Sequence, residues 1–411
     1  VDDTAVWSDR SVRSNVVTLA ISIINLVVWV LRWIGSYVPI EHRWIWVTIQ
    51  VYIVAGWTCA RELFAELAWP KTHRQCVDAL LESQFMKSRA VRIRAGTETA
   101  LVTGADGTIG SQIVFLLIKL GFNVCALAGS AAKMRTVIAD WTPVEKARVK
   151  VFQINFAEPL RMRTYLEQLR DRYEQFDVVC LAAGTMLAPD GPVHGFEHHA
   201  WVNVIAQAAV LRAVEEKMAD DARIVCLSSV CAHLALSNEL SDAELLHSQR
   251  HGVYEAYARS KLHLAVYCEQ LAKEWATAGP PSSSHSGSHH HKSASSASSV
   301  SPLLAPTPHS ASARRIVAVH PGVVPGGLYR HTNFLTQWLS GLVAHLLRSA
   351  VVAATFVLHT ALRDDAVSGG YYEDRERVRL APDLELKRRA MLFKEIEKAV
   401  DDLFSPAQPA M

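Results

Sequence analysis

Tyr257 and Lys261 are the two side chains whose types and spacing best suit chemistry, because they lie four residues apart in the stretch YARSK. On a helix this spacing puts the phenol and the ammonium group on one face. A free phenol has a pKa of about 10, so it acts as a base at neutral pH only beside a cation. Ser229 ends the upstream apolar stretch RIVCLSS, where its hydroxyl could hydrogen-bond an oxygen of a reacting molecule. These residues predict an acid–base site.

A glycine-rich turn is the second candidate site. The stretch TALVTGADGTIGSQIV places an apolar strand before Gly104, Gly107 and Gly110, and a helix after them. Gly104 permits a tight turn, Gly107 lets the backbone approach a pyrophosphate, and Gly110 lets the helix pack closely. The helix N-terminus adds N–H donors and a positive dipole. The alternative is a turn that only requires a positive φ.

Composition narrows the classes of protein. The chain has 411 residues, 50% of them hydrophobic, which is enough to bury a full core. The 42 basic and 40 acidic residues nearly balance, so no overall charge favours nucleic acid. The seven cysteines show no C-x-x-C spacing, which favours buried thiols in a reducing compartment. We expect no metal site, since His289, His290 and His291 are adjacent residues in a polar stretch.

The first 75 residues are predicted to form a membrane anchor. Two stretches, 15–31 and 44–60, lack charged residues, and we expect helices at about 15–34 and 44–60 that insert as a hairpin. Tryptophans gather at the ends of these stretches, as in interfacial belts. They are Trp29, Trp33, Trp44, Trp46 and Trp57. The alternative is a pair of buried core helices.

Basic residues predict how the anchor is oriented. Those flanking the hairpin are Arg10, Arg13, Arg61, Lys71 and Arg74. Under the positive-inside rule they put both ends of the hairpin in the cytosol, although Arg32 and Arg43 dilute the bias.

From residue 96 to 404, apolar stretches alternate with helical periods, which predicts a Rossmann-like α/β domain with a doubly wound parallel sheet. The expected strands are 100–103, 123–127, 149–154, 177–181, 223–227, 315–319 and 370–372, and helices include 111–120 and 160–173. Residues 279–313 are rich in Ser, His and Pro and have no apolar period, so we expect a disordered insert.

The order of glycine turn, strand-end serine, tyrosine and lysine resembles the short-chain dehydrogenase/reductase family. LAAG at 181–184 resembles the family's Asn-Asn-Ala-Gly turn, and HPGVV at 320–324 resembles its loop over the nicotinamide. GFEHHAWVNVIAQAAVL resembles the helix that carries the active-site asparagine, here Asn203, and GGYYED resembles the last strand. SKL after the tyrosine and LYRH at 328–331 are similar to the membrane-associated, retinol-dehydrogenase-like branch.

The resemblance implies an NAD(P)-dependent oxidoreductase acting on CH–OH groups. Tyr257 would be the acid/base, and Ser229 would hold the substrate oxygen. Lys261 would also bind the nicotinamide ribose, and Asn203 would organise a proton-relay water. The implied cofactor-binding residues are Thr103, Gly104, Gly107, Thr108, Ile109, Gly110, Ser130, Asn155, Phe156, Ala182, Ala183, Gly184, Tyr257, Lys261, Pro321, Gly322 and Val323.

The chain departs from the family pattern at several positions. Its glycines read Gly-x-x-Gly-x-x-Gly where this branch more often has Gly-x-x-x-Gly-x-Gly, and Asp106 puts a negative charge near the expected phosphates. Leu181 and Ala182 replace two asparagines, and Asn155 stands where the family often has aspartate. These departures bear on cofactor affinity more than on the reaction.

The end of the second strand bears on the choice of cofactor. Ala128 stands where an acidic residue would hold the ribose hydroxyls of NAD, and Gly129 stands where related NADP enzymes often have arginine. Ser130, Lys133 and Arg135 are near enough in sequence to meet a 2′-phosphate. We therefore favour NADP(H), with NAD(H) as the alternative.

The expected substrate is a lipophilic alcohol or its aldehyde or ketone, of the retinoid, steroid or isoprenoid type. Residues 334–347 have one apolar face that could dip into the membrane interface beside the site. The expected location is an internal membrane such as the endoplasmic reticulum, and a homodimer is the expected protein partner. Two alternatives stay open: a catalytically weak membrane-anchored binding or scaffold protein on this fold, and an extended-type epimerase or reductase.

Overall fold

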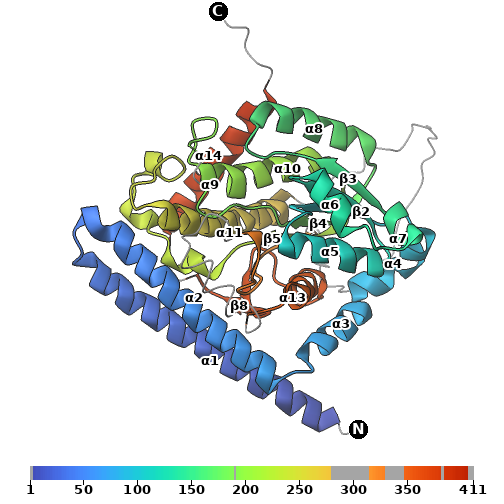
Figure 1. Cartoon of the computed structure of the whole chain (residues 1–411), viewed down its shortest axis with the longest axis horizontal. Coiled ribbons are helices and arrows are strands. Elements are labelled where there is room, and N and C mark those ends of the chain that lie inside the picture. Colours follow the sequence, from blue (N-terminus) through green and yellow to red (C-terminus); the bar gives the residue numbers. More distant parts are fainter. Residues whose placement is uncertain (1–2, 189–190, 279–313, 329–346, 381–383, 406–411) are drawn as a thin grey trace, which may run out of the picture.

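An eight-stranded sheet forms the centre of the computed structural model, which describes residues 3–188, 191–278, 314–328, 347–380 and 384–405. The strand order is β3-β2-β1-β4-β5-β6-β7-β8, and only the β7–β8 pair is antiparallel (Figure 1). The strands are β1 (Thr99–Thr103), β2 (Asn123–Ala128), β3 (Val149–Gln153), β4 (Phe176–Leu181), β5 (Met218–Leu227), β6 (Arg315–His320), β7 (Tyr371–Glu373) and β8 (Glu376–Val378).

Helices cover both faces of the sheet. One face packs against α3 (Thr72–Glu82), α4 (Gln84–Ala95), α5 (Thr108–Lys119) and α13 (Ala350–Leu362). The other packs against α8 (Pro159–Arg172), α10 (Ala206–Val214), α11 (Val253–Ala278) and α14 (Leu386–Phe404). The shorter helices are α6 (Ala131–Val137), α7 (Pro143–Ala147) and α9 (His198–Ala200). In β1, Leu101 belongs to one core and Ala100 and Val102 to the other, as expected of a strand buried on both faces.

The predicted doubly wound sheet is confirmed. The seven predicted strands match β1 to β7 within a few residues, and the helices predicted at 111–120 and 160–173 match α5 and α8. The short strand β8 was not predicted; it pairs with β7 across a tight turn in which Asp374 and Arg375 both have positive φ. The predicted insert at 279–313 and nearly all of the predicted apolar segment at 334–347 lie outside the described residues.

Two long helices, α1 (Asp3–Ser36) and α2 (Arg43–Ala68), form the predicted N-terminal hairpin. By length and composition, one segment of the described residues could cross a membrane, Arg13–Ser36 in α1. The second predicted membrane helix does not meet this criterion. Its face toward the α/β domain carries buried polar residues, among them Thr58, Arg61 and Glu62.

The hairpin lies along one side of the α/β domain (Figure 1). Its inner residues recur every three or four positions and are buried, as an amphipathic helix requires. In α1 they are Val17, Ile21, Ile24, Val28 and Leu31. The outer face is apolar and exposed: Leu26 is 61% exposed and Trp29 is 63% exposed. Each helix therefore has one face against protein, apolar in α1 and mixed in α2, and an apolar face that protein leaves uncovered.

The glycine turn lies at the switch point of the sheet, where β1 is flanked by β2 and β4. Gly104 has φ +62°, and a Cβ on it would lie 2.7 Å from the Cα of Ala183. A Cβ on Gly110 would lie 2.1 Å from the carbonyl oxygen of Gly104. Close backbone packing therefore requires glycine at the first and third positions of the motif.

We expect Gly110→Ala to destabilise the fold, because its methyl group would collide with the backbone of Gly104. The cost of such overpacking is about 1–3 kcal/mol. Gly56→Ala in α2 is the matched control, because its Cβ would meet no atom within 4 Å. The control should melt at or above the wild-type temperature, since alanine is the better helix former. Thermal unfolding of the three chains without cofactor measures the difference, and equal melting of Gly110→Ala and wild type would contradict the packing argument.

Candidate active site

The ends of six strands meet around a cavity of about 830 Å³. The segments after β1, β2, β3, β4, β5 and β6 reach it, as expected for the carboxyl edge of a parallel sheet. The predicted residues that line it are Gly104, Gly107, Thr108, Ile109, Gly110, Asn155, Phe156, Ala182, Ala183, Gly184, Ser229, Tyr257, Lys261, Pro321, Gly322 and Val323. Three predicted site residues, Thr103, Ser130 and Asn203, are not among the residues that line the cavity.

Ser229, Tyr257 and Lys261 lie together on the wall of this cavity. Ser229 follows β5 in extended conformation, and its Oγ accepts a hydrogen bond from the backbone N–H of Cys231 at 3.2 Å. Tyr257 and Lys261 lie one turn apart on α11, and the Nζ of Lys261 is 5.8 Å from the centre of the Tyr257 ring. All three are buried, so their contacts are little screened by water.

A hydrogen bond fixes the ammonium group of Lys261, which donates to the carbonyl oxygen of Leu227 at 2.9 Å. The group also lies close to Gly184, where an added Cβ would be 3.1 Å from it. Burial lowers the pKa of Lys261 from 10.5 to about 8. The lysine therefore remains mostly a cation at neutral pH, and a cation beside a phenol favours the phenolate.

Asn203 bonds to Thr185 and Ser260 and is not among the residues that line the cavity. It lies in a π-helical turn, Trp201–Ile205, a local distortion that is frequent at functional sites. Its Nδ2 donates to the carbonyl oxygen of Thr185 at 3.0 Å and to the Oγ of Ser260 at 2.9 Å, and its Oδ1 accepts from the N–H of Thr185 at 2.8 Å. These bonds tie the turn after β4 to α11, and the role of Asn203 in organising a water stays a prediction.

Thr103 likewise lies behind the cavity. Its Oγ1 donates to the Oε1 of Gln207 at 2.9 Å and accepts from the N–H of Ala183 at 3.0 Å. Thr103 therefore joins the glycine turn to the turn after β4. Gln207 was not predicted, because no feature of the sequence distinguishes it from a helix-surface residue.

The glycine turn and α5 suit a pyrophosphate. Gly107 is the N-cap of α5 and has no side chain over the helix end, and the first N–H groups of a helix have no partner within it. Thr108 replaces the second glycine of the more usual motif, and its Oγ1 accepts from the N–H of Gly327 at 3.4 Å. The close contacts of Gly104 and Gly110 bring this backbone to the cavity wall, so the residues present fit a dinucleotide.

The end of β2 carries two opposite charges beside the cavity. Asp106 accepts hydrogen bonds from the N–H groups of Gly129 and Ser130, at 2.9 and 3.2 Å, and it lines the cavity together with Lys133. Ser130 caps α6 by accepting from the N–H of Lys133. Ser130 thus has a structural role beside its predicted cofactor contact, and Asp106, which was expected to put a negative charge near the phosphates, organises this turn.

Asn155 also has a local partner. Its Oδ1 accepts from the N–H of Ala157 at 3.0 Å, and its Nδ2 donates to Glu158 at 2.8 Å. The residue lines the cavity, but these bonds occupy its side chain in the turn before α8.

Helix α2 is the part of the site that was not predicted. Seven of its residues line the cavity: Val51, Tyr52, Ala55, Gly56, Cys59, Ala60 and Leu63. The hydroxyl groups of Tyr52 and Tyr254 lie 3.2 Å apart, which joins α2 to the start of α11. The small residues between Ala55 and Ala60 could have indicated a helix that leaves room for a ligand. Small residues are also common in membrane helices, so they do not distinguish the two cases.

Comparisons with known proteins indicate the family to which this fold is similar. Residues 98–240 match the family model described as short chain dehydrogenase. Human retinol dehydrogenase 12 is 24% identical over 291 residues, which cover 69% of this chain and 80% of that protein. Mouse polyprenol dehydrogenase is 24% identical over 304 residues, which cover 71% of this chain and 80% of that protein.

Among solved structures, a crystal structure of an uncharacterized protein from Mycobacterium paratuberculosis aligns with a TM-score of 0.52 and 18% identity. The alignment covers 74% of this chain and 94% of that one, and it supports the fold alone. Taken with the cavity at the switch point, the sequence matches support a short-chain dehydrogenase/reductase of the retinol-dehydrogenase-like branch, and with it an NAD(P)-dependent oxidoreductase.

Proposed function

We propose that this chain is a membrane-bound oxidoreductase that interconverts a lipophilic alcohol and its aldehyde or ketone. The observation that carries the proposal is one cavity that joins the glycine turn, the buried Ser229, Tyr257 and Lys261, and an apolar wall from α2. The names of the relatives, retinol dehydrogenase and polyprenol dehydrogenase, support a substrate of the retinoid or isoprenoid type, with steroids as a related class.

The proposed mechanism assigns one task to each side chain. Tyr257 gives a proton to the carbonyl oxygen in reduction and takes it from the hydroxyl in oxidation. Ser229 donates a hydrogen bond to the same oxygen and holds it near the phenol. Lys261 supplies the buried positive charge that favours the phenolate and holds the nicotinamide ribose. A bound nicotinamide supplies or accepts the hydride, and Gly104, Gly107, Gly110, Pro321, Gly322 and Val323 would hold the cofactor.

The exposed apolar faces of α1 and α2 support binding to lipid. Large exposed side chains follow both helices: Leu19, Leu26, Trp29, Trp33, Tyr37, Trp44, Ile49, Tyr52, Phe64 and Leu67. Soluble domains rarely expose so continuous an apolar surface. Because the inner faces pack on the α/β domain, the hairpin is proposed to lie in the membrane surface rather than to cross it. The cytosolic side of an internal membrane such as the endoplasmic reticulum stays a prediction, and so does the homodimer.

NADP(H) is the proposed cofactor. Lys133 lines the cavity and is exposed at the end of β2, where a 2′-phosphate would need a cation. The negative charge of Asp106 lies nearby, but two backbone N–H groups already bind its carboxylate. Lys133 therefore supplies a positive charge after β2 that can contact the 2′-phosphate.

Replacing the phenol hydroxyl tests the proposed chemistry. Tyr257→Phe should lower kcat by about 10²–10⁴-fold, the contribution typical of general acid–base catalysis. Cofactor affinity, measured by calorimetry, should change little, because only the proton path is removed. Tyr254→Phe is the control: it removes a hydroxyl from the same helix and cavity and should retain turnover. Turnover of Tyr257→Phe at the wild-type rate would exclude Tyr257 as the acid/base.

A pair of charge variants tests the cofactor assignment. Lys133→Gln should lower the ratio of kcat/KM for NADPH to that for NADH, because it removes the cation. Asp106→Asn should raise the same ratio, because it removes the nearby negative charge. An exposed charge contact contributes modestly, so we expect each change to be of the order of tenfold or less. A wild-type enzyme that strongly prefers NADH, with a ratio unmoved by either variant, would contradict the proposal.

A substrate panel tests the lipophilic site. The full chain, purified in detergent or in vesicles, should give a higher kcat/KM with retinoid, steroid and isoprenoid aldehydes or ketones than with short soluble carbonyl compounds. Each CH₂ group buried against the apolar wall is worth about 0.8 kcal/mol. Better turnover of the short compounds under the same conditions would argue against a lipid substrate.

A further inference from the structure

Helix α2 inserts two charged side chains into the interior of the α/β domain. Arg61 is 7% exposed and Glu62 is 2% exposed. Burying charges in this way is expensive unless each finds a partner of opposite sign. The residues that Arg61 and Glu62 contact show which part of the active site α2 supports.

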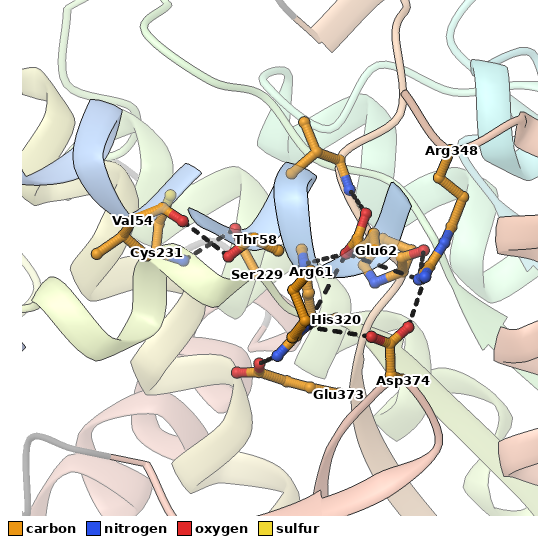
Figure 2. Close-up of polar contacts among 12 residues, drawn as sticks. Val54, Thr58, Arg61, Glu62, Ser229, Cys231, His320, Arg348, Glu373 and Asp374 are labelled. Carbon is orange, nitrogen blue, oxygen red and sulfur yellow. Dashed lines mark hydrogen bonds and ion pairs between the residues drawn. The ribbon is translucent and has the colours of Figure 1, made fainter. Parts of the chain in front are cut away.

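Glu62 binds the loop that follows β6 (Figure 2). Its Oε2 accepts a hydrogen bond from the backbone N–H of Val323 at 3.0 Å. Its Oε1 lies 3.4 Å from the Nε2 of His320 and 3.7 Å from Arg348. His320, Pro321, Gly322 and Val323 all line the cavity, so this carboxylate holds a cavity wall from behind.

The loop has little freedom around this contact. Gly322 has φ +102°, and a Cβ there would lie 2.7 Å from the Cδ of Arg348 and 3.0 Å from the Oε2 of Glu62. Arg348 in turn contacts Glu66 of α2 at 2.9 Å and binds Asp374 at 2.5 Å. The loop therefore lies between a carboxylate from α2 and an arginine that α2 also holds.

Arg61 forms the second half of the network (Figure 2). It contacts Glu373 at 3.0 Å and Asp374 at 3.3 Å, at the end of the last parallel strand. Glu373 also bonds His233 at 2.7 Å and lies 3.0 Å from the hydroxyl of Tyr371, which is 3.1 Å from the carbonyl oxygen of Ser229. Burial alone would raise the pKa of Asp374, but Arg348 and Arg61 lower it to about 2. The carboxylate is thus ionised at neutral pH.

We infer that α2 is a structural part of the active site and that Glu62 is a positioning residue for the loop at His320–Val323, which fixes that loop for cofactor binding. The inference rests on the proposed function for the assignment of Pro321, Gly322 and Val323 to the cofactor. The inference also links the two faces of α2. The outer face is proposed to contact lipid, and the inner face sets the position of the cofactor loop.

Shortening Glu62 by one methylene tests the inference. Glu62→Asp keeps the charge but withdraws the acceptor from the N–H of Val323. Calorimetry with NADPH and with NADH on the full chain in detergent should show roughly tenfold weaker binding of the preferred cofactor, as expected for the loss of one charge-assisted hydrogen bond. The KM for cofactor should rise by the same factor, while kcat at saturating cofactor should change less.

Glu82→Asp is the control. It removes the same methylene from an exposed glutamate at the end of α3, which does not line the cavity. The control should keep the wild-type cofactor affinity. Equal affinity in wild type and Glu62→Asp would overturn the inference, and so would equal weakening in both variants with a shared fall in melting temperature, which would indicate a general loss of packing.

Hydrogen–deuterium exchange on the wild-type chain tests the same inference without a variant. Adding NADPH or NADH should slow exchange in the loop at 320–327 and, together with it, in the part of α2 that contains Glu62. Protection of the loop with no change in α2 would overturn the inference while leaving the proposed function intact. A wild-type chain that binds neither cofactor by calorimetry would overturn the proposed function itself, and this inference with it.

Discussion

The contact between the glycine turn and the segment after β4 is the constraint on which the rest of the site depends. Gly104 packs against the backbone of Ala183, and the hydroxyl of Thr103 binds the N–H of the same residue. This contact holds the carboxyl ends of β1 and β4 together at the point where the sheet changes direction. The turns after β5 and β6 then reach the same cavity because all four strands are parallel. A side chain at Gly104 would separate the strand ends, and the groups that they carry would no longer share one cavity.

Buried charge is the second constraint, and it acts on the N-terminal hairpin. An apolar helix can slide or detach at modest cost, whereas Arg61 cannot leave Glu373 and Asp374, nor Glu62 leave Val323 and Arg348, without breaking buried charge contacts. The network therefore fixes the register of α2 on the domain. It does so beside Val47, Val51 and Val54, which share an apolar cluster with Tyr257. The position of the proposed acid/base is thus coupled to a helix that lies some two hundred residues earlier in the chain.

The sequence predicts those site residues that come directly after a strand, because strand ends can be located from the alternating pattern. Ser229, Tyr257 and Lys261 occupy the turn and helix that the alternating pattern implies, so their meeting at one cavity follows from topology. The hydrogen-bond partners of the side chains could not be predicted in this way. Ser130 caps α6, and Asn203 binds Thr185 and Ser260, and these partners depend on three-dimensional neighbours that the sequence pattern does not specify. The pairs Arg61–Glu373 and Glu62–Val323 join segments far apart in sequence, and no local period reveals them. Arg61 was read only as a flanking charge of a membrane helix.

The cavity-lining face and the uncovered apolar face of α2 suggest how the proposed lipid substrate could reach a buried site. The residues of α2 that line the cavity are mostly small, Ala55, Gly56, Cys59 and Ala60, so the wall leaves room for a bulky apolar group. Tyr52 lines the cavity and is also 41% exposed, so the cavity wall and the uncovered apolar face meet at one side chain. If that face rests in the membrane surface, a lipid alcohol passes from one apolar environment to another and its chain need not cross water. A separate anchor joined by a flexible tether would give no such continuity. Under the proposed function, the α/β domain and its N-terminal hairpin therefore act as one unit.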